Sequence, residues 1–440
     1  MTISILHIAP HYGGGVGSVV RSLISGQLKS EFEHRLLALE TINDETVSFA
    51  QKDDVTYLQT ALSDESILNQ WIEAADIVHL HWWNHPLLMK WIVSHNIPPC
   101  RLVLWSHVNG MYAPQVFFKE LFDFSDIFVF SSAYSYQSSV FPRNTKTEDI
   151  RIIQSQSKVN VIKDRQEKRT NSFKVGYIGT VDYAKMHPQF IDLCINAQID
   201  NAQFIVCGGP QEQALQHQVK ESGVESLFDI RGVITDVDKV LAECDVFGYP
   251  LNKEHYGTGE QVLLEAMGAG VVPVTLDTGC EKYLVDQGEN GLIVSSLKEY
   301  SAALNFLARD EGELKRMSMN GINKVRSLMQ DQYENEWSTL YRELLGYEKS
   351  RHRVSLPQAL PNITEGANLL LQSYGSIQLV ENLIDLLNIT KPLNAHNFPQ
   401  GIYSETRGSP YHYLRFFPDD AILQALCKRL EPYKLMETSL

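Results

Sequence analysis

Two glycine-rich stretches stand where a strand-like run gives way to a helical pattern. The first is His11-Tyr-Gly-Gly-Gly-Val-Gly-Ser18, after the apolar run Ile3–Ala9, and the second is Tyr256-Gly-Thr-Gly-Glu260. Glycines let backbone N–H groups approach a ligand closely, and a helix N-terminus attracts anions. Both stretches therefore predict an anion site, with a tight turn as the alternative for the first. Neither stretch has the Gly-Lys-[Ser/Thr] of a P-loop, which disfavours nucleotide hydrolysis of that kind. The candidate donors are Gly14, Gly15, Gly257, Thr258 and Gly259.

Charged side chains near these stretches are the next candidates for ligand contacts. Glu265 lies on the helical segment after the second stretch, between apolar neighbours, where a carboxylate is costly unless it is paired or bound. Lys185 and His187 lie in the loop after the strand-like run 174–179, which continues into Thr180. We expect Glu265 to bind a ligand, whereas a lone lysine in a loop such as Lys185 is usually solvated. A solvated surface position is the alternative for Glu265, and a capping position is the alternative for His187.

The segment Leu264–Val274 reads Leu-Glu-Ala-Met-Gly-Ala-Gly-Val-Val-Pro-Val. It is similar to the donor-binding signature of family 4 glycosyltransferases, which have the GT-B fold. The run Asp245–Pro250 and the stretch Glu289-Asn-Gly-Leu292 also resemble elements of that family. The resemblance covers about residues 1–347, closely in the second half and loosely in the first. It implies a nucleotide-diphosphate sugar as substrate, transfer with retention of anomeric configuration, and neither a metal nor another cofactor.

The resemblance also implies which carboxylates hold the donor. Glu265 aligns with the second Glu of the family's E-x7-E pair, which binds the nucleotide ribose. The first Glu of that pair contacts the donor sugar, and its position holds Gly257 here. Sugar recognition must therefore differ in this chain. Glu254 and Glu260 are possible replacements, although neither lies in register.

Of the two basic residues with which the family binds the diphosphate, this chain keeps the lysine and lacks the arginine. Thr180 stands where the family has Arg, Lys185 occupies a compatible place, and His187 lies close by in the sequence. His107 matches the family histidine that faces the donor sugar and the reaction centre. We therefore predict His107 and Lys185 as catalytic residues. In the front-face mechanism proposed for the family, the leaving diphosphate deprotonates the acceptor, so the protein positions substrates and stabilises charge.

Polar and aromatic residues also follow two strand-like runs of the first half. His81 and Trp82 end one run, and Asn109 follows the next. Because ligands of open α/β sheets bind outside the carboxyl ends of strands, we predict acceptor or sugar contacts for these three residues, with core packing as the alternative. A metal site of His79, His81 and His85 is conceivable, but no carboxylate or cysteine completes the set, and we expect no metal.

The order of strand-like and helical segments predicts how these residues are positioned. Short apolar runs alternate with helical patterns in two successive halves, which is typical of parallel sheets covered on both faces. We predict two doubly wound Rossmann-like domains facing a cleft. The expected parts are an acceptor domain over 1–165, a donor domain over 171–330, a return helix over 331–349, and a mostly helical or irregular segment over 350–440. The polar stretch Lys163–Ser172 is the expected linker and hinge.

Composition limits the partners and the compartment. The 440 residues carry a formal net charge of −15, which argues against nucleic acid as a partner. Six cysteines without a C-x-x-C pair, no apolar run of about 18 residues and no signal-peptide pattern predict a cytoplasmic protein. We expect the acceptor to be a glycan, a lipid-linked molecule or a small-molecule hydroxyl. Peripheral membrane contact is possible, and the sequence does not indicate the oligomeric state.

Two other functions are compatible with the sequence. The missing first Glu and the missing Arg also fit a catalytically silent GT-B protein that acts as a binding partner or scaffold. A related enzyme such as a nucleotide-sugar epimerase is the third possibility. Turnover of a nucleotide sugar distinguishes the scaffold from the enzymes, and a product that keeps its nucleotide identifies the epimerase.

Overall fold

The chain forms two units in the computed structural model. Unit 1 comprises Met1–Lys158 and Asp331–Tyr433, and unit 2 comprises Val159–Gln330. The cleft expected between the two halves stays a prediction, and the expected linker lies largely outside the described residues. The structure describes residues 2–59, 62, 64–141, 149–156, 159–163, 172–258, 260–329, 332–352, 354, 363–375, 380, 381, 383, 384 and 398–433.

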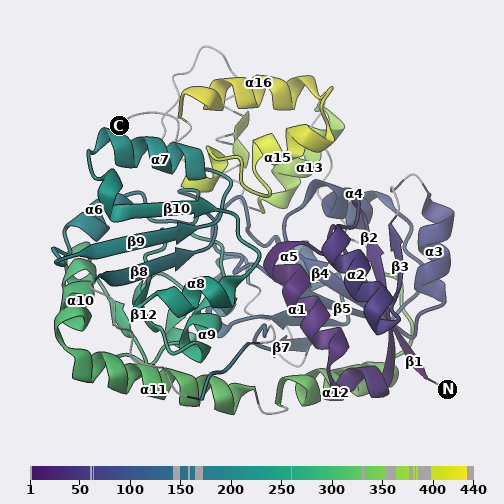
Figure 1. Cartoon of the computed structure of the whole chain (residues 1–440). Helices are drawn as coiled ribbons and strands as arrows, with labels where there is room; N and C mark the ends of the chain where they lie inside the picture. The colour runs from purple at the N-terminus through teal and green to yellow at the C-terminus, as the bar shows by residue number, and fades with distance from the viewer. Residues whose placement is uncertain are drawn as a thin grey trace. The chain divides into compact units, whose positions relative to one another are not determined.

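Unit 1 is built on a seven-stranded sheet with the order β3-β2-β1-β4-β5-β6-β7, drawn mainly in purple and blue in Figure 1. Every neighbouring pair in this sheet is parallel. Its middle strands consist of buried residues, as expected for a sheet covered on both faces. The strands are β1 (Ile3–Ala9), β2 (Phe32–Ala38), β3 (Thr56–Gln59), β4 (Ile77–Trp82), β5 (Leu102–Ser106), β6 (Ile127–Phe130) and β7 (Ile150–Ile152).

Helices of unit 1 come from both ends of the chain. The return helix expected over 331–349 is α12, whose Trp337 and Tyr341 are buried in the same apolar cluster as Trp105 of β5. The helices before the crossover to unit 2 are α1 (Gly14–Ser25), α2 (Asp44–Asp53), α3 (Glu65–Glu73), α4 (Pro86–Ser94) and α5 (Lys119–Phe122). Those after it are α12 (Gln332–Leu345), α13 (Glu365–Ser373), α15 (Pro410–Phe416) and α16 (Ala421–Leu430).

The first glycine-rich stretch is the start of a helix rather than a free loop. Helix α1 begins at Gly14, with Gly13 at its N-cap, and buries an apolar face that includes Val20 and Leu23. A side chain at Gly17 would overlap the carbonyl of Tyr12, so the close approach of helix and loop requires glycine there.

The last described part of the chain packs on unit 1. Helices α13, α15 and α16 lie side by side, and α13 and α15 also contact α4 (Figure 1). Their buried residues include Leu370, Tyr413 and Leu426. The described part of the segment expected to be helical or irregular therefore forms a small group of helices packed against α4.

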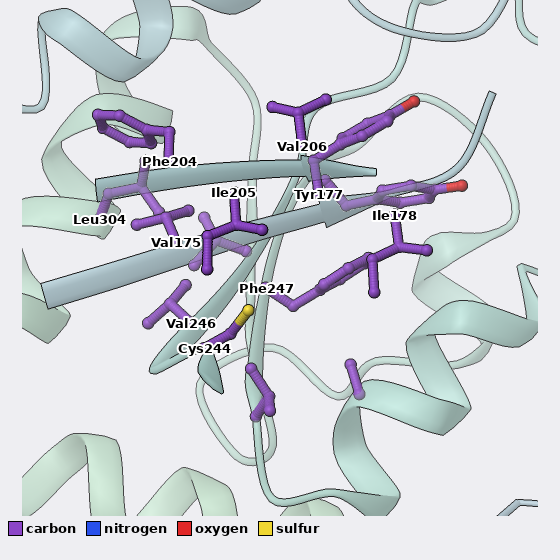
Figure 2. Packing of buried hydrophobic residues seen from close by; sticks show 14 of the residues in the cluster. Val175, Tyr177, Ile178, Phe204, Ile205, Val206, Cys244, Val246, Phe247 and Leu304 are labelled. Atoms are coloured by element: carbon purple, nitrogen blue, oxygen red, sulfur yellow. The ribbon is translucent and has the colours of Figure 1, made fainter. Parts of the chain in front are cut away.

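Unit 2 is built on a six-stranded parallel sheet with the order β10-β9-β8-β11-β12-β13. Figure 2 shows how side chains such as Val175, Phe204 and Phe247 pack along the strands in its core. The strands are β8 (Phe173–Ile178), β9 (Ala202–Cys207), β10 (Phe228–Gly232), β11 (Val246–Tyr249), β12 (Val272–Leu276) and β13 (Leu292–Val294). The helices are α6 (Phe190–Ile195), α7 (Glu212–Glu221), α8 (Val237–Glu243), α9 (Gln261–Gly268), α10 (Leu297–Arg309) and α11 (Glu311–Leu328).

Both sheets have the doubly wound topology that the alternating pattern predicts, so the expected fold class is confirmed. In each sheet the first strand lies beside the fourth, and the strand order reverses at that point. Ligands of such sheets bind outside the carboxyl ends of the strands at this reversal. In the described part of the chain, no helix is both long enough and apolar enough to cross a bilayer.

Candidate active site

A cluster of polar side chains lies at the strand reversal of unit 2, between β8 and β11. The loop after β8 carries Lys185, β11 ends at Tyr249, and the segment between β11 and α9 carries Glu260. The ammonium Nζ of Lys185 lies 3.1 Å from Oε2 of Glu260, and the Tyr249 hydroxyl donates to the same oxygen at 2.6 Å. The sheet topology thus brings together a cation, a carboxylate and a phenol from three segments.

The lysine and the glutamate stabilise each other's charged forms. The side chain of Glu260 is 2% exposed and that of Lys185 is 15% exposed. Burial alone would raise the pKa of Glu260, but Lys185, His255 and the hydrogen bond from Tyr249 together outweigh it, and the pKa lies below its ordinary value. Burial likewise disfavours the ammonium, yet attraction to Glu260 raises the pKa of Lys185 above its ordinary value. Both groups are therefore charged at neutral pH.

The carboxylate of Glu260 occupies space that Gly257 leaves open. A Cβ at position 257 would overlap this carboxylate, so the missing side chain and the placement of Glu260 go together. Oxygen Oε1 of Glu260 is buried and has no hydrogen-bond partner among the described residues, and Oγ1 of Thr258 is in the same situation. Buried polar atoms without partners are rare in folded proteins. These two atoms therefore favour a polar ligand at this loop.

A second buried pair, His255 and Glu281, contacts the same loop. The backbone N–H of Gly257 donates to Nδ1 of His255 at 3.1 Å, which leaves the ring proton on Nε2. That nitrogen lies 3.1 Å from Oε1 of Glu281, and both side chains are almost fully buried. No motif in the sequence marks His255 or Glu281 as a site residue. The only available signal was their position beside the glycine-rich stretch and after β12.

The Lys185–Glu260 pair predicts a pH dependence of stability. Because the folded pKa of Glu260 is lowered, its contribution is present above its unfolded pKa and is lost as the pH falls through the folded pKa. Because the folded pKa of Lys185 is raised, its contribution is present below its unfolded pKa and is lost as the pH rises through the folded pKa. We expect Glu260→Gln to lower the free energy of unfolding most near neutral pH, and less toward about pH 3. Urea unfolding across this range measures the difference, and a constant difference would contradict the prediction.

Two other donor residues predicted in unit 2, Thr180 and His187, lie in the same loop after β8 as Lys185. The backbone carbonyl of Thr180 accepts the Tyr177 hydroxyl at 2.7 Å, and the backbone N–H of His187 donates to the carbonyl of Pro250 at 3.0 Å. Glu265 is half-buried on α9. Gly259 lies outside the described residues. A surface hollow of about 970 Å³ between α6 and α10 contains none of the predicted site residues.

The predicted residues of unit 1 divide into accessible and buried ones. Gly14 and Gly15 are exposed in the first turn of α1. His107 is half-buried, and its Nε2 shares a hydrogen bond with Nδ1 of His81 at a distance of 2.9 Å. Burial lowers the pKa of His107 to about 3, so its ring is neutral.

His81, Trp82 and Asn109 are each 0% exposed. The ring of Trp82 packs edge-on against Phe118, and Oδ1 of Asn109 accepts the N–H of Met111 at 3.0 Å. These three side chains belong to the core of unit 1. The accessible surface that we expected them to offer an acceptor is absent, and we do not propose such contacts for them.

Near the strand reversal of unit 1, His85 lies in a polar group with Glu40 and Arg407. Nε2 of His85 lies 2.9 Å from Oε1 of Glu40, and the Arg407 guanidinium lies 5.9 Å from the centre of the Trp83 ring. Burial and the charge of Arg407 lower the pKa of His11 to about 3. Arg407 comes from the chain's last segment, more than 300 residues after His85, so no local pattern could have placed it there.

Comparison with protein families agrees with this geometry. Residues 159–324, which form nearly all of unit 2, match a family model described as "Glycosyl transferases group 1". The match contains Lys185, Glu260 and Glu265.

One curated relative is a 2-deoxystreptamine N-acetyl-D-glucosaminyltransferase from Niallia circulans. It is 29% identical over 122 residues, which make up 27% of this chain and 31% of the relative. The chain thus matches under a third of that protein's length.

Solved structures match over both units. The crystal structure of Anabaena HepE in complex with UDP and glucose aligns with a TM-score of 0.63 at 15% identity, covering 78% of this chain and 100% of the other. Sucrose-phosphate synthase from Thermosynechococcus elongatus aligns with a TM-score of 0.59 at 16% identity, covering 78% and 99%. These alignments show the fold.

The chain therefore has the GT-B class of fold, with two Rossmann-like sheets. Residues 159–324 match the group 1 glycosyltransferase model, which confirms the resemblance seen in the sequence.

Proposed function

We propose that this chain transfers a sugar from a nucleotide-diphosphate sugar to an acceptor hydroxyl with retention of anomeric configuration. The observation that carries this proposal is the buried cluster of Lys185, Tyr249 and Glu260 at the strand reversal of unit 2. It combines a cation for the diphosphate with a carboxylate oxygen that still lacks a partner among the described residues. The group 1 family match over the same unit supports it.

Each donor contact has a candidate in the structure. An ammonium has three N–H donors, so Lys185 can bind the diphosphate while one donor stays on Glu260. Oε1 of Glu260 accepts a sugar hydroxyl and takes over the task of the missing first glutamate, because Gly257 leaves room for it. Thr258 adds a hydroxyl, and Glu265 binds the ribose. The N–H groups at the start of α1, at Gly14 and Gly15, add dipolar stabilisation for the phosphates.

In the reaction, the bond from the anomeric carbon to the phosphate oxygen breaks and a bond to the acceptor oxygen forms. The acceptor proton moves to the departing diphosphate. Lys185 stabilises the negative charge that develops on that diphosphate. His107 lies at the carboxyl end of β5 with a neutral ring and positions the sugar by a hydrogen bond. This scheme needs no metal ion at the diphosphate.

We further propose a uridine nucleotide, because the structure of HepE holds UDP and glucose, and an acceptor among glycans, lipid-linked molecules or small-molecule hydroxyls. The relative from Niallia circulans is named as an N-acetylglucosaminyltransferase, which makes that sugar the second candidate after glucose. The cytoplasmic location belongs to the same proposal. All six cysteines are free and buried, which suits a reducing compartment.

The test is a donor panel measured with the purified full chain. UDP-glucose, UDP-N-acetylglucosamine and GDP-mannose are each titrated by calorimetry and then incubated with and without candidate acceptor hydroxyls. Binding of a uridine donor with release of UDP supports the proposal. Absence of both binding and turnover with every donor would instead favour the scaffold function, and a product that keeps its nucleotide would identify an epimerase.

Replacement of Glu265 by alanine is expected to weaken UDP binding by about tenfold or more, because a ribose hydroxyl loses a charged acceptor worth roughly 1.5–3 kcal/mol. Calorimetry with UDP measures this change. The matched control is Glu225→Ala, an exposed glutamate of the same unit, which should bind UDP like the wild type. Unchanged affinity in Glu265→Ala would remove the ribose role.

A further inference from the structure

Three histidines from two neighbouring strands lie together in the core of unit 1. His7 of β1 and His79 of β4 are register partners in a parallel pair, and His81 follows two residues later on the same face of β4. All three side chains are 0% exposed. One ring nitrogen from each lies within 4.8 Å of the other two.

The nitrogens that point out of this triad each have one partner. Nε2 of His7 lies 2.9 Å from Nδ1 of His34, and Nδ1 of His81 lies 2.9 Å from Nε2 of His107. Nδ1 of His79 lies 2.7 Å from the hydroxyl of Tyr341. This is the arrangement of metal-ligating histidines, whose second ring nitrogen donates to a neighbouring acceptor.

Of the three nitrogens that face one another inside the triad, only two have a hydrogen-bond partner in the described part of the chain. Nδ1 of His7 and Nε2 of His81 lie 3.0 Å apart and can share one proton. Nε2 of His79 is buried and has no hydrogen-bond partner among the described residues. Proton sharing alone therefore leaves one buried nitrogen unexplained, although such atoms are normally paired. A cation at the centre would satisfy all three nitrogens.

We propose that His7, His79 and His81 bind a zinc ion through Nδ1, Nε2 and Nε2 respectively. Zn–N bonds of about 2.0–2.1 Å hold tetrahedral ligand nitrogens roughly 3.3 Å apart, so the 3.0 Å pair already fits, and the ligand nitrogen of His79 lies within 4.8 Å of the other two. Three imidazoles without a thiolate suit zinc, and they leave its fourth position for water.

The set differs from the one that the sequence suggested. Nε2 of His85 lies 2.9 Å from Oε1 of Glu40, and its ring packs against His412, so His85 belongs to another cluster. His7 takes its place because β1 lies beside β4. The proposed ion lies in the core of unit 1 and has no part in binding the diphosphate to Lys185.

The ion would also fix the proton on the predicted catalytic histidine. Zinc on Nε2 of His81 leaves the proton of His81 on Nδ1, which then donates to Nε2 of His107. His107 must in that case keep its own proton on Nδ1, the nitrogen that remains for a substrate. The proposed metal site does not depend on the proposed activity, because zinc binding is measured without any sugar donor.

The experiment uses the full chain with any affinity tag removed. Zinc content is measured by mass spectrometry after dialysis, and the chelator-stripped chain is titrated with Co²⁺, whose tetrahedral complexes absorb visible light. We expect one equivalent of zinc per chain, a cobalt spectrum typical of tetrahedral nitrogen ligands, and a lower melting temperature after stripping. Less than a tenth of an equivalent together with no cobalt band would overturn the proposal.

Conservative variants that leave the core of unit 1 packed show where the ion binds. Tyr341→Phe removes only the hydroxyl next to His79 and should weaken zinc affinity by about 10- to 100-fold. Tyr333→Phe, a hydroxyl deletion on the same helix, and His85→Gln should keep full binding. His79→Gln should lose the cobalt band. Equal zinc binding in His79→Gln and the wild type would place the ion elsewhere and overturn the assignment.

Discussion

Lys185→Ala is expected to lower kcat/KM for the nucleotide sugar by about 10²-fold or more, the scale of one lost charge-stabilising donor. The ammonium is held by Glu260 at 3.1 Å, so it is already positioned before the donor arrives. With Thr180 in the place of the family's arginine, no guanidinium is available at that position to share the charge. The effect should appear mainly in kcat, because charge on the diphosphate develops in the transition state.

The same substitution also affects folding, and the two effects must be separated. Removing Lys185 leaves the carboxylate of Glu260 buried without its cation, which costs about 3–5 kcal/mol for a buried pair. Lys185→Gln keeps a hydrogen-bond donor for Glu260 without the charge, and Lys185→Arg keeps the charge. We expect Lys185→Gln to recover stability but not activity, and Lys185→Arg to recover part of both.

Lys282→Ala is the matched control for these variants. Lys282 lies in the same unit but is exposed and pairs with Asp277 at the surface, so its loss should change neither turnover nor melting temperature measurably. Near-normal turnover in a folded Lys185→Gln chain would remove Lys185 from the mechanism. Turnover that falls only in proportion to the folded fraction would give Lys185 a structural role.

The strands of both sheets are predictable because buried parallel strands are short continuous apolar runs. Elements with weaker signals were missed. Strand β3 is an edge strand whose residues are mostly exposed, so its sequence lacks the apolar run. Helix α11 is polar overall and contains Gly321, although its buried face includes Met317 and Ile322. Its helical spacing is present but is diluted by charged residues.

The candidate site was predictable only in part, for a geometric reason. Lys185 follows a strand at a recognisable distance, so the sequence could predict it as a site residue. The placement of Glu260 depends on the absence of a side chain at Gly257, which a register count cannot show. The triad of histidines depends on β1 lying beside β4. His7 and His79 are 72 residues apart, and only the strand order reveals that they meet.

Deletion of all residues after Val354 is expected to lower the melting temperature of unit 1 by about 10 °C or more. The removed segment supplies buried Tyr413, whose hydroxyl donates to Oδ1 of Asn84 at 2.8 Å, and Ser373, which accepts from Nδ2 of Asn84 at 2.9 Å. Asn84 is 1% exposed in the full chain. In the truncated chain, Asn84 and its neighbours would be exposed to water. Each large buried side chain contributes about 1.5–3 kcal/mol, and each kcal/mol shifts the melting temperature by roughly 2–4 °C in a domain of this size.

The truncated chain also tests what the segment does at the predicted acceptor side. Arg407 leaves with it, and burial together with Arg407 is what lowers the pKa of His11. UDP binding should persist, because Lys185 and Glu260 lie in unit 2. Tyr413→Phe removes one hydroxyl, should cost about 1 kcal/mol, and calibrates the thermal shift. A truncated chain that melts like the full chain and keeps its acceptor KM would mean that the segment neither supports unit 1 nor contributes to its site.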